Sequence, residues 1–379
     1  MLRLRSCIAA RLLPSTSAAP ISPLHRFLSA TAVSPNPSFA VEEYLVDTCG
    51  LTRAQALKAS TKLSHVKSPT NPDAVLAFLA GLGLSGADIA AVVTKDPKFL
   101  CAKVDKTLTP VVFGLTGLGL SRPEVARLVP VLPNKFRRRS IVSNLPYCML
   151  LFGSYDNLLR ALKLNDHLLT CDLETTVKPN VAFLRECGLG DCDITKLGSR
   201  MLTAGLENLR AMVACAERVG VPRGSGMFRK ALNEVAFLGE EKIAVKVEYL
   251  KNTLRWSDAE VRIAVYKYPS LLSMSNEILQ SKSDFLISEV GLEPAYIAQR
   301  SVVLSYSLEG RLRPRYNVVK FLKENGLLDH DRDYYAAVMV TEKVFVEKFI
   351  CPHKEAAPRL AEDYEAACRG EVPTRFRFA

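Results

Sequence analysis

The apolar residues of one stretch, residues 245–286, recur at helical spacing and outline a complete structural unit. The first of them lie three and four positions apart, as on the buried face of a helix: Val247, Leu250 and Leu254. The sequence from Ser257 to Glu260 is a Ser-x-x-Glu capping box, which predicts the start of a second helix. Pro269 ends that helix, because the residue before a proline is disfavoured in the α conformation. The stretch therefore predicts two helices joined by a short turn.

This pattern recurs along the chain with a period near 35 residues. The position two before the capping serine, which we call the mark, is Arg255 here and glycine elsewhere: Gly50, Gly83, Gly119, Gly153, Gly188, Gly220, Gly291 and Gly326. Successive marks are 33, 36, 34, 35, 32, 35, 36 and 35 residues apart. Glycine suits the left-handed conformation that commonly ends a helix. A helical period of this length predicts a solenoid, in which stacked units supply a core that no single unit could form.

Other features keep the same register. Prolines lie fourteen residues past three of the marks, at Pro97, Pro133 and Pro269. Capping sequences also repeat after the marks, whereas the copies around Gly153 and Gly220 match the pattern least well. We therefore expect an all-α superhelical solenoid over residues 41–350, built from about eight or nine tandem helix pairs of roughly 35 residues each.

Two motifs resemble the mitochondrial transcription termination factor (mTERF) family of plants. One is Lys-Asp-Pro-Lys-Phe-Leu at residues 95–100, with its counterpart Tyr-Lys-Tyr-Pro-Ser-Leu-Leu at residues 266–272. The other, VVLSYSLEGRLRPR at residues 302–315, resembles the penultimate repeat of that family. The resemblance covers roughly residues 41–350. It implies a curved, all-helical array that binds nucleic acid inside an organelle.

The two ends of the chain differ from the array in composition. Residues 1–28 contain four arginines, many serines and alanines and no acid, which is typical of an organelle-import signal. The sequence around Leu28 is similar to a mitochondrial processing site, although chloroplast import is an alternative. We expect a linker at residues 29–40 and a C-terminal cap and tail at residues 351–379. No stretch approaches 18 uninterrupted apolar residues, so we expect no membrane span.

The net charge indicates a moderately basic protein. The chain contains 50 Lys and Arg residues against 39 Asp and Glu residues, a formal net charge of +11. Without the predicted leader, 46 basic and 39 acidic residues remain, or +7. This balance is compatible with binding to a polyanion such as nucleic acid.

Basic residues recur at two positions of the predicted second helices. Seven or eight residues past the marks lie Arg127, Arg160, Lys196 and Arg262, and twelve past lie Lys95, Arg200 and Lys267. Stacking would align them into a basic stripe that binds nucleic acid in a concave groove. The alternative is simple complementation of the helix dipole, with acids at the helix start and bases at its end. That alternative explains the mid-helix bases less well, so we favour the stripe.

Two further basic clusters are candidate nucleic-acid contacts. One follows Pro133 and contains Lys135, Arg137, Arg138 and Arg139; the other contains Arg311, Arg313, Arg315 and Lys320. Guanidinium groups pair bidentately with phosphate oxygens and with guanine. The alternatives are a solvated loop for the first cluster and a helix start with extended side chains for the second. Tyr266 and Tyr306 are candidates for stacking on unpaired bases.

The sequence offers no convincing catalytic, cofactor or metal motif. Residues 81–86 fit G-x-G-x-x-G but follow a helical run, whereas a dinucleotide site requires a preceding strand. Cys187 and Cys192 lack the second pair of ligands that a zinc site needs. We therefore expect a protein that is not an enzyme and binds neither cofactor nor metal.

The favoured function is that of a mitochondrial protein that binds duplex DNA as a monomer and regulates or terminates transcription. One alternative is an RNA-binding factor for organellar intron splicing or RNA processing. Another is a non-catalytic helical scaffold whose groove holds a peptide or helix. Salt-dependent binding to polyanions distinguishes the first two from the scaffold.

Overall fold

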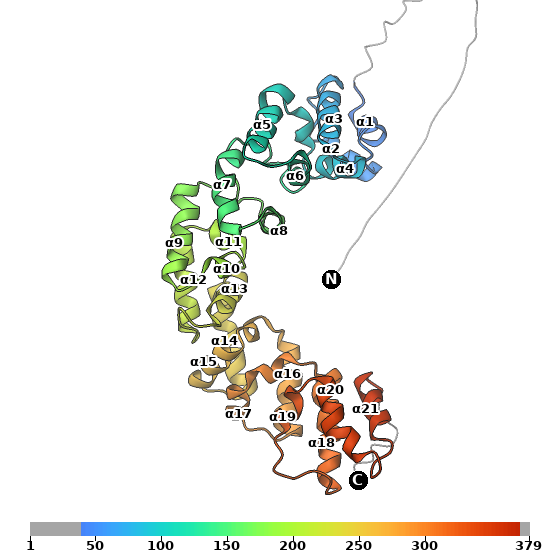
Figure 1. Cartoon of the computed structure of the whole chain (residues 1–379), viewed down its shortest axis with the longest axis vertical. Coiled ribbons are helices and arrows are strands. Elements are labelled where there is room, and N and C mark those ends of the chain that lie inside the picture. Colours follow the sequence, from blue (N-terminus) through green and yellow to red (C-terminus); the bar gives the residue numbers. More distant parts are fainter. Residues whose placement is uncertain (1–38, 372–379) are drawn as a thin grey trace, which may run out of the picture.

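The structure is a computed structural model that describes residues 39–371, and within this range it is helical without a strand. The helices stack in chain order into an open arc, with the N-terminal helices at one end and the C-terminal helices at the other (Figure 1). The predicted all-α class and superhelical stacking are confirmed. The predicted leader at residues 1–28, and most of the predicted linker, lie outside the described residues.

Each unit begins with a first helix that runs toward its mark. These first helices are α1 (Val41–Asp47), α3 (Thr70–Leu82), α5 (Thr109–Gly117), α7 (Ser140–Phe152), α9 (Lys178–Glu186), α12 (Leu206–Arg218), α14 (Glu240–Leu254), α16 (Asn276–Ser283) and α18 (Arg313–Glu324). Short π-helical turns adjoin four of them: η2 (Val104–Leu108), η3 (Leu173–Val177), η5 (Asp284–Glu289) and η7 (Leu308–Leu312).

A second helix follows each mark. These helices are α2 (Arg53–Ser60), α4 (Gly86–Lys95), α6 (Arg122–Leu128), α8 (Tyr155–Leu164), α10 (Asp191–Ile194) with α11 (Ser199–Leu202), α13 (Phe228–Leu238), α15 (Asp258–Lys267), α17 (Pro294–Gln299) and α19 (Tyr334–Met339). The array ends in α20 (Glu342–Phe345), η8 (Val346–Ile350), η9 (Cys351–His353) and α21 (Leu360–Cys368). These last elements form a second hydrophobic cluster with α18.

The backbone at the marks confirms the register predicted from the sequence. Every glycine mark has a positive φ, between 67° at Gly326 and 103° at Gly220. Arg255 has φ 55° and is the only non-glycine residue with a positive φ between residues 39 and 371. Gly153, where the sequence pattern is weak, has φ 70°. The left-handed residue at the end of each first helix turns the chain toward the second helix, as expected.

The predicted capping boxes are present at the starts of four second helices. In each box the side chain at the third helical position accepts a hydrogen bond from the backbone N–H of the capping residue: Thr52 with Gln55, Ser85 with Asp88, Ser121 with Glu124, and Ser257 with Glu260. These bonds satisfy N–H groups that the helix itself leaves without partners.

The repeating unit contains a third element that the prediction of helix pairs missed. A 3₁₀ helix closes several units: η1 (Pro97–Cys101), η4 (Pro269–Ser273) and η6 (Ser301–Ser305). Proline starts two of them, since its fixed φ suits the first turn of a helix and it has no N–H to leave unpaired. Leu271 and Leu272 within η4 are 0% exposed. The closing 3₁₀ helix therefore contributes side chains to the core and does more than end the second helix.

Polar side chains on the first helices hold these closing segments in place. Asn144 Nδ2 donates to the carbonyls of Leu169 and Cys171 at 3.1 and 2.7 Å. Asn71, Asn180, Lys246, Lys282 and Arg315 make the corresponding bonds in their own units. We call these residues the latch residues. Each satisfies carbonyl groups at the end of a helical segment, where no intrahelical donor is available.

Candidate nucleic-acid interface

The second helices define the face on which basic residues were predicted. In the N-terminal and middle parts of the arc, α6, α8, α10 and α13 lie along its inner side, whereas α7, α9 and α12 lie along its outer side (Figure 1). Farther on, α15 and α17 lie on the outer side of α14 and α16 in this view. In this view the second-helix face therefore winds from the inner to the outer side along the arc, so the second helices do not all share one side.

Five of the predicted contact residues in the middle units of the array are exposed: Arg138, Arg139, Arg160, Lys196 and Arg200. Arg160 donates a hydrogen bond to Asn157 Oδ1 on its own helix. Arg138 and Arg139, just before α7, form no ion pair with any residue in the described range. This group is geometrically available to a polyanion, and we call it the inner basic set.

Other members of the predicted stripe connect neighbouring units. Arg127 on α6 forms an ion pair with Asp156 on α8 at 2.6 Å, with both side chains more than half exposed. Lys267 Nζ donates to the carbonyl of Gln299 at 2.6 Å, at the end of α17. Lys95 makes the same kind of bond to Val131 O at 2.9 Å. These two lysines, each twelve residues past its mark, thus bind backbone carbonyls of the next unit. Neither interpretation of the sequence, a basic stripe that binds nucleic acid or complementation of the helix dipole, predicted this role.

The cluster after Pro133 divides into buried and exposed halves. Lys135 is 6% exposed, and its Nζ lies 2.6 Å from Asp166 Oδ1. Arg137 pairs with Asp96 at 2.6 Å and donates to Lys98 O at 3.0 Å. The prediction that Lys135 contacts nucleic acid is wrong for this structure, because its ammonium group is enclosed by protein.

The cluster from Arg311 to Lys320 is largely structural as well. Arg315 is 0% exposed and donates to the carbonyls of Ala337 and Val340 at 2.9 and 2.7 Å, so the prediction that it contacts nucleic acid is also wrong. Arg311 donates to the carbonyl of Val338 at 3.0 Å. Arg313 pairs with Glu289 and Glu309, and Lys320 lies 3.8 Å from Glu324. The most family-like motif of the sequence therefore holds the end of α19 in place.

The two candidate stacking residues differ in accessibility. Tyr266 on α15 is 41% exposed. Tyr306 is half-buried, and the Arg311 guanidinium carbon lies 4.1 Å from its ring centroid. Because that guanidinium already covers the ring, the structure does not support Tyr306 as a stacking platform.

Two exposed lysines on the second-helix face were missed by the sequence analysis. Lys163 on α8 and Lys230 on α13 each lie ten residues past their marks, at Gly153 and Gly220. Lys163 and Arg127 both line a cavity of about 490 Å³ between α4, α6 and α8. Their common offset from the marks is the signal that could have identified them. This common offset occurs in the two units whose sequence pattern is weakest, around Gly153 and Gly220.

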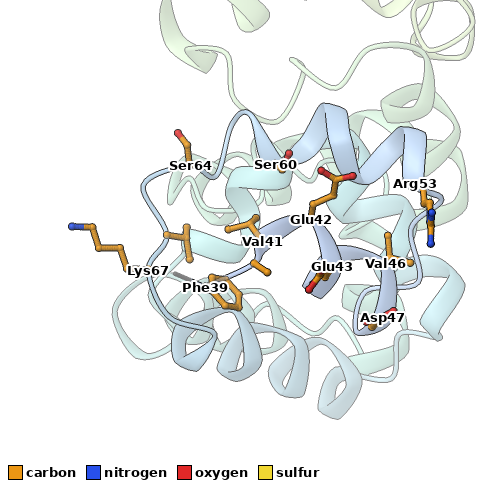
Figure 2. Close-up of a pocket in the computed structure, with 12 residues that line it drawn as sticks. Phe39, Val41, Glu42, Glu43, Val46, Asp47, Arg53, Ser60, Ser64 and Lys67 are labelled. Carbon is orange, nitrogen blue, oxygen red and sulfur yellow. The ribbon is translucent and has the colours of Figure 1, made fainter. Parts of the chain in front are cut away.

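Another cavity lies at the N-terminal end of the array and differs in the charges that line it. It has a volume of about 1290 Å³ and is lined by three acids, Glu42, Glu43 and Asp47, against two bases, Arg53 and Lys67. Figure 2 shows Lys67 at one side of this pocket and Arg53 at the opposite side. With acids in excess, this pocket is a poor site for a nucleic-acid backbone.

The described residues show no arrangement that would hold a metal ion. No group of three or more His, Cys, Asp or Glu side chains between residues 39 and 371 is close enough to bind one.

Burial raises the pKa of the Cys148 thiol to about 12 and that of Cys49 to about 11, so both remain protonated. None of the helices in this range is long and apolar enough to cross a membrane.

Comparisons with known proteins place these features in a family context. The family model described as mTERF matches residues 65–345. Three similar relatives come from Arabidopsis thaliana. "Transcription termination factor MTEF18, mitochondrial" is 23% identical over 277 residues, covering 73% of this chain and 48% of the relative. "Transcription termination factor MTERF15, mitochondrial" is 26% identical over 203 residues, covering 53% and 45%. "Transcription termination factor MTERF8, chloroplastic" is 20% identical over 316 residues, covering 81% and 58%.

The extent of these matches separates the array from its ends. The chain spans about half the length of the first two relatives. The family match excludes α1 and α2 at one end and α21 at the other. Both ends nevertheless pack into hydrophobic clusters: Leu45 of α1 and Ala56 of α2 into one, and Leu360 and Tyr364 of α21 into the other.

Proposed function

The chain belongs to the mTERF family, and from this premise we propose that it is an organellar nucleic-acid-binding protein that regulates gene expression. The observation that carries the proposal is the inner basic set, whose cations remain exposed on consecutive middle units of the array. Cations in this position neutralise backbone phosphates and release counterions, which drives sequence-independent binding. The paired bases of the stripe, such as Arg127, would meet phosphates only after exchanging a carboxylate partner.

We propose duplex DNA as the favoured client and transcription termination or regulation as the outcome. Exposed cations recur from unit to unit, whereas exposed aromatic rings on the second helices are sparse. Proteins that bind single strands without sequence preference rely on such rings for base stacking. The names of the three relatives describe them as transcription termination factors, which supports the same outcome here.

RNA is the second candidate client, and specific side chains favour it. Tyr266 on α15 and Phe237 on α13 are 41% and 79% exposed, so both could stack on unpaired bases. A client bound through these rings would be single-stranded or looped RNA, as in intron splicing or RNA processing. The protein scaffold remains a third alternative, and it predicts binding that salt barely affects.

We propose a mitochondrial location for the protein and action as a monomer. The arginine-rich composition of residues 1–28 supports import, with residues 29–40 as linker, residues 41–350 as array and residues 351–379 as cap and tail. Two of the relatives are named as mitochondrial and one as chloroplastic, so import of a fluorescent fusion into both organelles is the appropriate test.

Fluorescence anisotropy with the full chain tests the client. Binding to a short duplex DNA, its separated strands and a hairpin RNA is measured between about 50 and 200 mM salt. We expect the tightest binding to the duplex, with log affinity falling by about 0.9 per neutralised phosphate per unit of log salt concentration. Preference for the hairpin RNA would favour the second candidate, and binding independent of salt would contradict both.

A triple variant tests the inner basic set. Replacing Arg138, Arg139 and Arg160 by glutamine should weaken binding to all sequences and reduce the salt slope by about 3. The matched control replaces Lys58, Lys62 and Lys67, which are exposed near the N-terminal end of the array. An equal loss of affinity and slope in the control would show that only net charge matters, and it would overturn the assignment.

A further inference from the structure

A second kind of site lies at the junction of two neighbouring units, away from the inner basic set. Three helices, α12, α14 and α15, enclose a cavity of about 450 Å³. Each helix contributes residues spaced three and four apart, so one face of each helix forms a wall. Small-molecule sites in proteins usually have volumes of about 300–1,000 Å³.

The inside of this cavity is apolar. Val219, Ile243 and Val261 line it and are 7%, 2% and 2% exposed. Val247 is half-buried beside them, and Ala244 contributes a small exposed side chain. The apolar surface that a ligand would remove from water lies mainly on Ala244 and Val247, because the other three side chains are already almost fully buried. Each Å² of apolar area buried contributes about 25 cal/mol.

The acids around the cavity are already paired. Glu240 forms an ion pair with Arg218 across the junction between α12 and α14. Lys251 lies 3.1 Å from Glu248 and 3.0 Å from Asp258, so one ammonium group serves both carboxylates. The acidic side chains at the rim therefore present little free negative charge to a ligand.

Arg262 is the charged group at the rim without an acidic partner among residues 39–371. Arg127 occupies the comparable position on α6 and pairs with Asp156, three residues past the next mark. The residue three past Gly291, which follows Arg262, is Pro294 and cannot accept such a bond with its side chain. The exposed Arg262 guanidinium is thus left to face an external anion.

A close backbone contact fixes Arg262 at this rim. A Cβ atom added to Gly220, at the end of α12, would lie 2.7 Å from Arg262 Cβ and 2.8 Å from Arg262 O. The two units therefore meet at a glycine that no larger residue could replace without a shift. This contact fixes the backbone and Cβ of Arg262 beside the cavity, so only its side-chain torsions have to be ordered when a ligand binds.

We propose that this cavity binds a small amphipathic anion, a monocarboxylate with an apolar body the size of a medium-chain fatty acid. The aliphatic body would contact Val219, Ile243 and Val261, and the carboxylate would accept hydrogen bonds from Arg262. Bound ligand would neutralise that arginine and bridge two units of the array. This site is independent of the proposed nucleic-acid function, and its test requires no nucleic acid.

Isothermal titration calorimetry with the full chain, using octanoate and 1-octanol as probes, tests the site. We expect saturable binding of octanoate with one site per chain, and weaker binding of the uncharged alcohol. Arg262→Gln should weaken octanoate binding about tenfold and leave octanol binding unchanged, because it removes a hydrogen bond between charged groups. The matched control is Arg160→Gln, an exposed arginine at the same distance from its own mark, which should have no effect.

A space-filling variant tests whether the ligand lies in the cavity. Ala244→Trp places an indole where the apolar body would lie, so both probes should lose binding, with circular dichroism confirming the fold. If this variant fails to fold, protection of residues 240–248 from hydrogen exchange by octanoate in the unmodified protein replaces it. Absence of octanoate binding, an equal effect of Arg160→Gln, undiminished binding to a folded Ala244→Trp variant, or absence of that protection would each overturn the proposal.

Discussion

At the scale of single residues, identical side-chain types serve opposite roles in this protein. Arg138 is exposed, whereas Arg315 is fully buried and donates to carbonyls at the end of α19. In the sequence, both belong to a basic cluster that lies near a proline. The difference arises because burying a guanidinium is tolerated only where several acceptors converge on it. Around Arg315 those acceptors are backbone carbonyls and the Glu342 carboxylate at 2.7 Å.

Arg315→Met should separate the structural role of this residue from any role in binding. We expect the free energy of unfolding to fall by about 3 kcal/mol, because several carbonyls lose their donor. Urea unfolding provides the measurement, and Arg138→Met, at an exposed site, should change stability by no more than about 0.5 kcal/mol. If Arg315→Met instead retained stability and lost affinity for nucleic acid, our structural assignment of Arg315 would be wrong.

Glycine at a mark can be tested against glycine inside a helix. Gly83→Ala should destabilise the protein by about 1–2 kcal/mol, because φ at this position is 101° and a Cβ is disfavoured there. Gly81, two residues earlier within α3, offers a matched control with open space around it. Gly81→Ala should stabilise by up to about 1 kcal/mol, as alanine favours a helix. Similar effects of the two substitutions in thermal unfolding would contradict the role of the mark.

At the scale of elements, several second helices begin with local side-chain hydrogen bonds, whereas α10, α13 and α17 have no side-chain cap. Glu260 accepts hydrogen bonds from the backbone and side chain of Ser257, and these hold the pKa of its carboxyl below the ordinary value of 4.5. Because the folded-state pKa is lowered, the carboxylate contributes stability above the unfolded-state pKa. That contribution disappears as the pH falls through the folded-state pKa.

Glu260→Gln should therefore change the pH dependence of stability more than stability itself at neutral pH. Glutamine can make the same backbone bond without titrating, as Gln55 does with Thr52. We expect the melting temperature of the variant to fall less than that of the unmodified protein as the pH drops below about 4.5. Parallel melting curves for the two proteins across that range would rule out the cap as the source of the effect.

At the scale of the whole molecule, stability is organised along one dimension. Each unit packs on its neighbours, and the latch residues close the units to which they belong, so a defect there should remain local. Asn180 is 0% exposed and donates to carbonyls after α11, at 2.8 Å from the oxygen of Ala204. Its loss would weaken one unit and the interfaces on either side, but not the distant end of the arc.

Asn180→Leu tests this locality by hydrogen exchange. We expect faster exchange in α9, α12 and their immediate neighbours, because the carbonyls after α11 lose their donor. Exchange in α18 should remain unchanged. Uniform acceleration along the entire chain would show instead that the array unfolds as a single cooperative unit.

The sequence by itself determined the class of fold, the register of the units and the ends of many helices. These features depend on contacts between residues a few positions apart: the left-handed mark, the Ser-x-x-Glu box and the apolar spacing of three and four. A short segment such as residues 247–261 carries all of that information. Even the weak copies at Gly153 and Gly220 obeyed the rule, because the conformational preference of glycine is local.

Only the tertiary structure decided which charges are available. Arg127, Lys135 and Lys267 find their partners about 30 residues farther along the chain, and whether a partner is present depends on how one unit stacks on the next. The winding of the second-helix face and the cavity beside Arg262 have the same origin. Periodicity along a chain sets which residues share a helix face, but the rotation between stacked units sets what each face meets.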